Sequence, residues 1–215
     1  MRAAVLVRKG DPERAFEIRD LGEPEPRSDE VRIDVAAFGL NFADVLARLG
    51  LYPDAPPRPC VLGYEVAGTI SAVGSQVTDL REGDRVAAFT RFGGYATHVV
   101  TPARGVVRIP QKMNLVTAAS LPVQLGTAWY CAEEMVRLQP GDHVLVQAAA
   151  GGVGGALVQL AKGRGCTVYG TAGGPAKIQH LRELRVDHPI DYLEEDFADS
   201  IRAPILAHIA GNGLD

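Results

Sequence analysis

A glycine-rich segment in the second half of the chain has the residue pattern that nucleotide binding requires. The apolar run Val144–Val146 leads into a cluster of glycines, and helix-like apolar spacing follows it. In such a strand–turn–helix unit, backbone amides of the turn and of the helix N-terminus point at an anion, and glycines let the anion come close. The fingerprint G-x-G-x-x-G reads Ala149-x-Gly151-x-x-Gly154, with alanine in place of the first glycine. We expect a dinucleotide pyrophosphate to bind at Ala150, Gly151, Gly152, Val153 and Gly154.

Two other interpretations of this segment are weaker. A membrane helix that packs through Gly151 and Gly155 is disfavoured because glycines crowd its centre and because Gln147 and Gln159 lie inside it. A structural turn that binds no phosphate stays open.

The composition is that of a globular protein. The 215 residues are 47% hydrophobic and carry a net charge of −4, which fits one large or two small domains. No cluster of Lys and Arg predicts a surface for nucleic acid or an anionic membrane. Three widely separated cysteines and the lack of a signal-peptide pattern favour a reducing, cytoplasmic environment.

The N-terminal half is mostly β in pattern. Glu30–Ala37 alternates, with Val31 and Ile33 on one face, and glycine and proline turns separate the other apolar runs. A helix is expected at Phe42–Leu49, with Asn41 as its N-cap and Gly50 just past its end. Many short strands of this kind indicate a small barrel or sandwich. The expected strands are Ala3–Val7, Glu30–Ala37, Val66–Val73, Arg85–Phe89, Ala96–Val100 and Val106–Ile109.

From Leu115 the pattern changes to helix-rich and then to alternating strands and helices. Pro189 falls inside the third of these strands, and proline belongs at sheet edges. In the strand order 3-2-1-4-5-6 of a dinucleotide-binding fold, the third strand is an edge, so the proline agrees with that topology. The expected elements are a helix-rich region at Leu115–Leu138, strands Val144–Val146, Thr167–Gly170 and His188–Ile190, and helices Ala176–Leu184 and from Asp196.

The order of the motifs resembles one superfamily along essentially the whole chain. The motifs are Asn41-Phe42-Ala43-Asp44, Gly50-Leu51-Tyr52-Pro53, Gly63-Tyr64-Glu65-Val66-Ala67-Gly68, Gly83-Asp84-Arg85-Val86, Ala148–Gly154, Thr167–Thr171, Lys177 and Ile190-Asp191-Tyr192. They resemble the medium-chain dehydrogenase/reductase superfamily, and within it the zinc-free quinone oxidoreductases of the zeta-crystallin and vesicle amine transport protein groups. The resemblance implies an α/β fold with a GroES-like β-barrel catalytic domain at residues 1–120. A Rossmann NADP-binding domain, truncated at its C-terminus, would follow at residues 121–215.

The resemblance also bears on metal binding. Zinc members of the superfamily use a cysteine near position 41 and a histidine in a Gly-His-Glu triplet, where this chain has Asn41 and Gly63-Tyr64-Glu65. An amide and a neutral phenol are poor zinc ligands, and the histidines show no ligand spacing. We therefore expect no metal.

The predicted cofactor is NADPH. NAD enzymes place an acidic residue about 20 residues after the glycine turn, and none stands at the end of the strand here. The resemblance puts Lys177 and Tyr192 on the 2′-phosphate, and Gly173 would give it room. Taken alone, Lys177 is better interpreted as a solvated charge, and the missing acid together with Tyr192 favours the phosphate role. Thr171, Gly173, Lys177 and Tyr192 complete the predicted cofactor contacts.

The zinc-free relatives transfer hydride from NADPH to quinones or to activated enones, which need less Lewis-acid help than simple carbonyls. We expect Asn41 and Thr127 to lie near the nicotinamide and Tyr52 to contact the acceptor oxygen, with Gln124 a weaker candidate. Alternatives stay open for each: Asn41 as a helix cap, Tyr52 stacked on a proline-rich loop, and Thr127 as a buried helix hydroxyl. Asp44 and Glu65 are interpreted as a structural polar network.

The length limits the second domain. The residues after Val144 hold about three βα units, half of a six-stranded domain. The resemblance implies that the fourth strand begins at Leu214-Asp215. We expect a fragment of a longer protein, because a naturally short chain would leave Val144–Val146 as an apolar edge strand. Cofactor binding is then more secure than turnover, the homodimer of full-length relatives is doubtful for this chain, and a nucleotide-binding module without turnover is the rival hypothesis.

Overall fold

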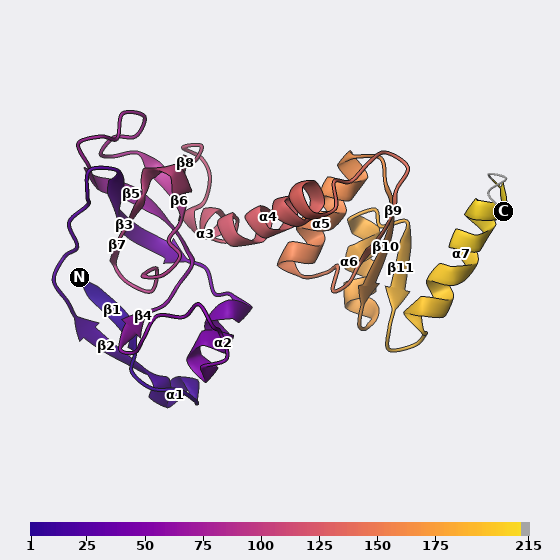
Figure 1. Cartoon of the computed structure of the whole chain (residues 1–215), viewed down its shortest axis with the longest axis horizontal. Coiled ribbons are helices and arrows are strands. Elements are labelled where there is room, and N and C mark those ends of the chain that lie inside the picture. The colour runs from indigo at the N-terminus through magenta and orange to yellow at the C-terminus, as the bar shows by residue number, and fades with distance from the viewer. Residues whose placement is uncertain (212–215) are drawn as a thin grey trace. The chain divides into compact units, whose positions relative to one another are not determined.

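The computed structural model describes residues 1–211, which form two compact units that divide between Val123 and Gln124 (Figure 1). The expected β-rich N-terminal part and α/β C-terminal part are both present. Leu214 and Asp215, where the fourth strand was expected to begin, lie outside the described residues.

The N-terminal unit is built on two antiparallel sheets. The larger has the strand order β7-β3-β5-β6-β8 and the smaller β2-β1-β4. Short helical segments α1 (Pro12–Ala15), η1 (Ala103–Gly105) and α3 (Leu115–Ala119) lie between or after the strands. The strands are β1 (Arg2–Leu6), β2 (Phe16–Asp20), β3 (Glu30–Phe38), β4 (Cys60–Val61), β5 (Glu65–Val73), β6 (Arg85–Phe89), β7 (His98–Pro102) and β8 (Val106–Arg108).

Alternation of side chains in β3 explains the core of this unit. Val31 and Ile33 are fully buried, and they pack against Val66 and Ile70 of β5 and Val86 of β6. Each of these strands therefore hides one face in a shared apolar core, as period-2 patterning requires.

Helix α2 (Phe42–Leu49) has the expected bounds. Gly50 ends it in the left-handed conformation, with φ of 74°, which glycine adopts without steric cost. The ends of this helix place Asn41 and Tyr52, the two residues expected to act at the reacting atoms from this unit.

The C-terminal unit contains a parallel sheet with the order β11-β10-β9 in the described part of the chain. β9 spans His143–Val146, β10 Thr167–Ala172 and β11 His188–Asp191. Pro189 pairs with Gly170 in register on the edge strand β11, which confirms the edge position expected from the proline.

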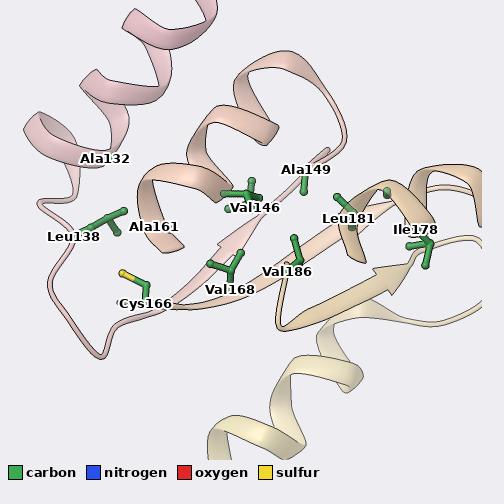
Figure 2. Close-up of a cluster of buried hydrophobic side chains, with 12 residues drawn as sticks. Ala132, Leu138, Val146, Ala149, Ala161, Cys166, Val168, Ile178, Leu181 and Val186 are labelled. Carbon is green, nitrogen blue, oxygen red and sulfur yellow. The ribbon is translucent and has the colours of Figure 1, made fainter. Parts of the chain in front are cut away.

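Helices α5 (Gly152–Gly163) and α6 (Pro175–Glu183) pack with this sheet around one apolar cluster (Figure 2). Val158 and Ala161 of α5 and Leu181 of α6 are fully buried there, as is Val168 at the centre of the sheet. Burial of this cluster fixes α5 at the end of β9, and so holds the glycine turn between them.

The region Leu115–Leu138 is helix-rich, as expected: α3 is followed by α4 (Pro122–Trp129) and a π-helical turn (Tyr130–Met135). Other local expectations were wrong. The strand expected at Ala96–Val100 is shifted to His98–Pro102, because the chain first pairs through Ala96 with β1. Strands β2 and β4 were missed, since β2 is mostly exposed and β4 is only two residues long.

The last described element is α7 (Phe197–Gly211), and none of the helices among residues 1–211 has the length and apolar character to cross a bilayer.

Candidate functional site

A small pocket of about 170 Å³ lies at the carboxyl ends of β9 and β10. Ligands of open α/β sheets bind at this edge. The volume is below the roughly 300–1,000 Å³ of a site that encloses a whole ligand, so the pocket suits one part of a dinucleotide. It is lined by Ala148, Ala150, Gly151, Ala172, Gly173, Lys177 and Tyr192.

Backbone hydrogen bonds hold the turn between β9 and α5, and one residue of the turn has an unfavourable backbone conformation. Ala148 has φ of 50°, in the left-handed region that costs a residue with a side chain about 1 kcal/mol or more. Its carbonyl accepts the Gly151 N–H at 2.9 Å, while the Ala149 N–H donates to the Thr171 carbonyl at 2.9 Å. Ala148 thus makes the tight turn that the first fingerprint glycine usually makes, and Ala149 is buried beneath it.

Helix α5 begins with free backbone donors. Its N-cap, Gly151, provides no side-chain cap, and its carbonyl accepts the Gly155 N–H at 2.7 Å as the helix starts. The N–H groups of Gly152, Val153 and Gly154 therefore lack intrahelical partners, as at any helix start, and carry the positive end of the helix dipole. An anion placed there would satisfy them.

Two glycines of the turn are required by close contacts. A Cβ at Gly154 would lie 2.8 Å from the Ala149 Cα, so the third fingerprint glycine permits the helix to pack on the turn. A Cβ at Gly152 would collide with the side-chain amide of Gln124. Gln124, the weaker candidate from the sequence, thus lies against the glycine turn.

The far end of the pocket is formed by the loop after β10. A Cβ at Gly173 would lie 2.7 Å from the Tyr192 hydroxyl, so the glycine leaves room beside this tyrosine. The Asp191 carboxylate accepts the Gly174 N–H at 3.0 Å and the Leu193 N–H at 3.1 Å. This carboxylate therefore shapes the loop, and it is not among the residues that line the pocket.

Lys177 occupies an electrostatically unfavourable position for a free lysine. It lies in the first turn of α6. This turn contains no acidic residue, and the helix has no side-chain cap at its N-terminus. A cation at the positive end of a helix is disfavoured by about 0.3–1 kcal/mol. An anion bound between Lys177 and the helix N-terminus would interact favourably with both. This placement favours an anion-binding role over the solvated-charge alternative.

In the N-terminal unit, Asn41 belongs to a buried polar network. The Asn41 amide Nδ2 donates to Glu65 Oε1 at 2.9 Å, and the Asn41 N–H donates to Asp44 Oδ2 at 3.0 Å. Glu65 is 1% exposed and also accepts the Val123 N–H at 2.8 Å. Asn41 is thus both a helix cap and a side chain whose amide is oriented by a buried carboxylate.

Asp44 is the second buried acid of this network. Burial raises the pKa of Asp44 above its ordinary value of 3.8, although hydrogen bonds from the Asn41 N–H, the Tyr95 hydroxyl and the Gly63 N–H act in the opposite direction. The expected structural role of Asp44 and Glu65 agrees with these contacts, because each carboxylate links segments distant in sequence.

Tyr52 packs in an aromatic group. Its ring meets that of Tyr64 edge-on, with centroids 6.1 Å apart, and Tyr64 lies 5.1 Å from Phe92. The Tyr64 hydroxyl is buried without a hydrogen-bond partner among the described residues. Burial, followed by the neighbouring Tyr52 hydroxyl, raises the pKa of Tyr64, so it stays a neutral phenol.

Thr127 lies on α4 and is exposed, which contradicts the alternative of a buried helix hydroxyl. Thr171 is buried and does not line the pocket; its backbone carbonyl anchors the turn instead. Five of the predicted cofactor residues line the pocket together, whereas the pocket residues Ala148 and Ala172 and the loop residue Asp191 were not predicted. Only the loop-closing Asp191 had a sequence signal, since an acid after a strand often caps the turn that follows. The five that line it are Ala150, Gly151, Gly173, Lys177 and Tyr192.

Comparison with known proteins places this site in a family. Residues 27–111 match the family described as alcohol dehydrogenase GroES-like domain, and residues 152–215 match the zinc-binding dehydrogenase family. The human synaptic vesicle membrane protein VAT-1 homolog is 40% identical over 204 residues, which are 94% of this chain and 52% of that protein. The chain belongs to the medium-chain dehydrogenase/reductase superfamily. Within this superfamily of nicotinamide-dependent oxidoreductases, it falls in the quinone oxidoreductase-like group.

Solved structures of the superfamily agree with both units of the fold. The Escherichia coli quinone oxidoreductase complexed with NADPH aligns with a TM-score of 0.87 and 30% identity, over 95% of this chain and 63% of that one. The CurK enoyl reductase aligns with a TM-score of 0.87 and 34% identity, over 95% of this chain and 64% of that one. The chain thus spans about half the length of the vesicle protein and less than two thirds of each solved chain.

Proposed function

We propose that this chain carries the NADPH-binding and acceptor-binding parts of a cytoplasmic oxidoreductase that reduces a small quinone or an activated enone without zinc. The single observation that supports it most is the pocket that unites the glycine turn with Gly173, Lys177 and Tyr192. The superfamily gives the reaction class, and the similar Escherichia coli protein is a quinone oxidoreductase whose structure was solved in complex with NADPH.

The residues present fit a dinucleotide. The free N–H groups at the start of α5 would hold the pyrophosphate, and Lys177 with Tyr192 would hold the 2′-phosphate at the other end of the pocket. Among the described residues, no carboxylate lines the pocket to take the ribose hydroxyl of NAD or to repel a 2′-phosphate. NADPH is therefore preferred over NADH, and when bound it supplies the hydride.

The chain's own residues would position the reaction. The Glu65 carboxylate fixes the orientation of the Asn41 amide, which would contact the nicotinamide, and Tyr52 would donate a hydrogen bond from its hydroxyl to the acceptor oxygen. Thr127, exposed on α4 of the C-terminal unit, would contact the cofactor. These contacts lower the barrier by orientation and by stabilising charge that develops on the acceptor.

The zinc-free proposal rests on the donors at the positions that zinc relatives use. Asn41 offers an amide, and Tyr64 a phenol whose pKa is raised by burial. The Glu65 and Asp44 carboxylates are already engaged by N–H donors. Among the side chains that the structure describes, no group of three or more His, Cys, Asp or Glu residues is arranged to hold a metal ion.

The test is oxidation of NADPH, followed by absorbance, with a quinone and separately with an enone as acceptor. Turnover that persists after exhaustive chelation supports the proposal. Tight NADPH binding with no turnover on either acceptor favours a nucleotide-binding module instead.

A further inference from the structure

A second, larger pocket lies wholly in the N-terminal unit, beside the C-terminal end of α2. Its volume is about 650 Å³, within the range of roughly 300–1,000 Å³ typical of small-molecule sites. Prolines of the loop after Tyr52 form much of its wall, and Tyr52 itself lines it. Two cations, Lys9 and Arg58, line it, and none of the lining residues in the described part of the chain is acidic.

The charge of this pocket is not neutralised by the protein. Among the described side chains, neither Lys9 nor Arg58 forms an ion pair. Asp54, the one acid in the adjoining loop, is held by Arg91, with Nη2 to Oδ1 and Oδ2 at 2.9 and 3.1 Å. The pocket therefore presents two positive charges over an otherwise uncharged wall, which attracts an anion.

Lys9 is held at this pocket by the local fold. A Cβ on Gly50 would lie 2.5 Å from Lys9 Nζ and 2.6 Å from its Cδ, so the lysine side chain lies in space that the missing side chain leaves. The segment around Lys9 is also tied to α2 in both directions, because the Gly10 N–H donates to the Arg48 carbonyl at 3.3 Å and the Arg48 guanidinium donates to the Gly10 carbonyl.

We propose that this pocket binds an anionic substituent of the acceptor, such as a carboxylate. The inference rests on the proposed function, because Tyr52 belongs to both sites. It lines this pocket, and it is the residue proposed to contact the acceptor oxygen. The site selects acceptors that carry a negative group on the side of the molecule away from the reducible bond. Lys9 and Arg58 form charge-assisted hydrogen bonds to that group.

A purely structural role of the cations predicts something different. Lys9 Nζ lies near the carbonyl end of α2, where a cation stabilises the helix dipole. In that case, removal of the charge lowers the melting temperature and leaves ligand preference unchanged.

The experiment measures binding, so that it does not depend on turnover. Equilibrium dialysis compares two enones of equal size, 4-(3-oxobut-1-enyl)benzoate and its neutral carboxamide. We expect the wild-type chain to bind the carboxylate about fivefold more tightly or better, a preference that falls with ionic strength. The double variant Lys9→Gln/Arg58→Gln should bring the two affinities to within about twofold of each other.

Matched controls separate the pocket from general charge. Arg104→Gln/Lys112→Gln makes the same change of two charges on exposed side chains that do not line the pocket, and it should keep the wild-type preference. Inorganic phosphate should displace the carboxylate and not the carboxamide; displacement of both, or of neither, contradicts an anion subsite on the acceptor. Equal or undetectable binding of the two enones by the wild-type chain overturns the proposal, as does an unchanged preference in a double variant with an intact melting transition. NADPH oxidation without any carboxylate preference would overturn this inference alone, whereas a carboxylate preference without NADPH oxidation would overturn only the proposed function.

Discussion

Glu65 is the buried carboxylate on which the geometry of the N-terminal unit depends, and its replacement should be costly. It is 1% exposed, accepts Asn41 Nδ2 at 2.9 Å and the Val123 N–H at 2.8 Å, and lies so close to the backbone that a Cβ on Gly39 would fall 2.6 Å from its Cγ. Bulk solvent has little access to a carboxylate this buried, so it cannot readily replace the lost acceptor. Substitution therefore leaves buried polar groups unsatisfied.

The magnitude follows from these two bonds. A hydrogen bond to a charged group contributes about 1.5–3 kcal/mol, so Glu65→Ala should lower the free energy of unfolding of this unit by about 3–5 kcal/mol. Glu65→Gln keeps one acceptor oxygen but sets its NH₂ against a donor, and it should cost about 1–2 kcal/mol. Glu17→Gln, on an exposed glutamate, should cost less than about 0.5 kcal/mol.

Urea denaturation followed by far-UV circular dichroism measures these differences, with tryptophan fluorescence in parallel. The single tryptophan, Trp129, lies in the C-terminal unit, so its transition reports on that unit. If Glu65→Ala lowers the free energy of unfolding by less than about 1 kcal/mol, the Asn41 and Val123 donors do not depend on Glu65, because they then find other partners.

Three further predictions concern the two pockets and the sheet. Tyr52→Phe should lower the turnover of NADPH with a quinone by more than it lowers NADPH affinity; an unchanged rate removes Tyr52 from the mechanism. Gly173→Ala adds a Cβ 2.7 Å from the Tyr192 hydroxyl and should weaken NADPH binding about fivefold by calorimetry, whereas Gly163→Ala, at an open position of α5, should not. Burial acts to raise the pKa of Asp187, but the Lys162 ammonium and the Val168 N–H outweigh it, so the pKa is lowered from its ordinary 3.8. A lowered pKa stabilises the fold above that value, so Asp187→Asn should cost about 1 kcal/mol at neutral pH, and the difference in fluorescence-monitored unfolding should shrink as the pH falls below 3.8.

Elements with a strong local signal were predictable from the sequence. Phe42–Leu49 has apolar periodicity with Asn41 before it and Gly50 after it, and the helix has these bounds. Pro189 predicted an edge strand because proline lacks the N–H that a second neighbour would need.

Elements set by tertiary contacts were not predictable. Strand β4 consists of Cys60 and Val61 and exists because β1 pairs with it, so no local pattern announces it. The π-helical turn at Tyr130–Met135 interrupts a sequence whose apolar spacing is helical throughout.

The residues of the candidate site also fall into those that the sequence indicates and those that only the fold reveals. Gly151 and Lys177, which line the pocket, could be singled out from the sequence because their residue types suit an anion site. Ala148 could not, because its left-handed conformation is a property of the backbone, and alanine gives no sign of it. The position of Lys9 beside Gly50 joins segments about forty residues apart, a contact that only the fold creates.

In the function proposed above, the pocket at Gly173, Lys177 and Tyr192 holds the 2′-phosphate of NADPH. Calorimetric binding of NADPH and NADH to the wild-type chain and to Lys177→Gln tests it directly. We expect NADPH to bind the wild type at least about tenfold more tightly than NADH, and Lys177→Gln to lose most of that difference without weakening NADH. Equal affinity of the wild-type chain for the two cofactors, or an undiminished NADPH preference in Lys177→Gln, would contradict the assignment.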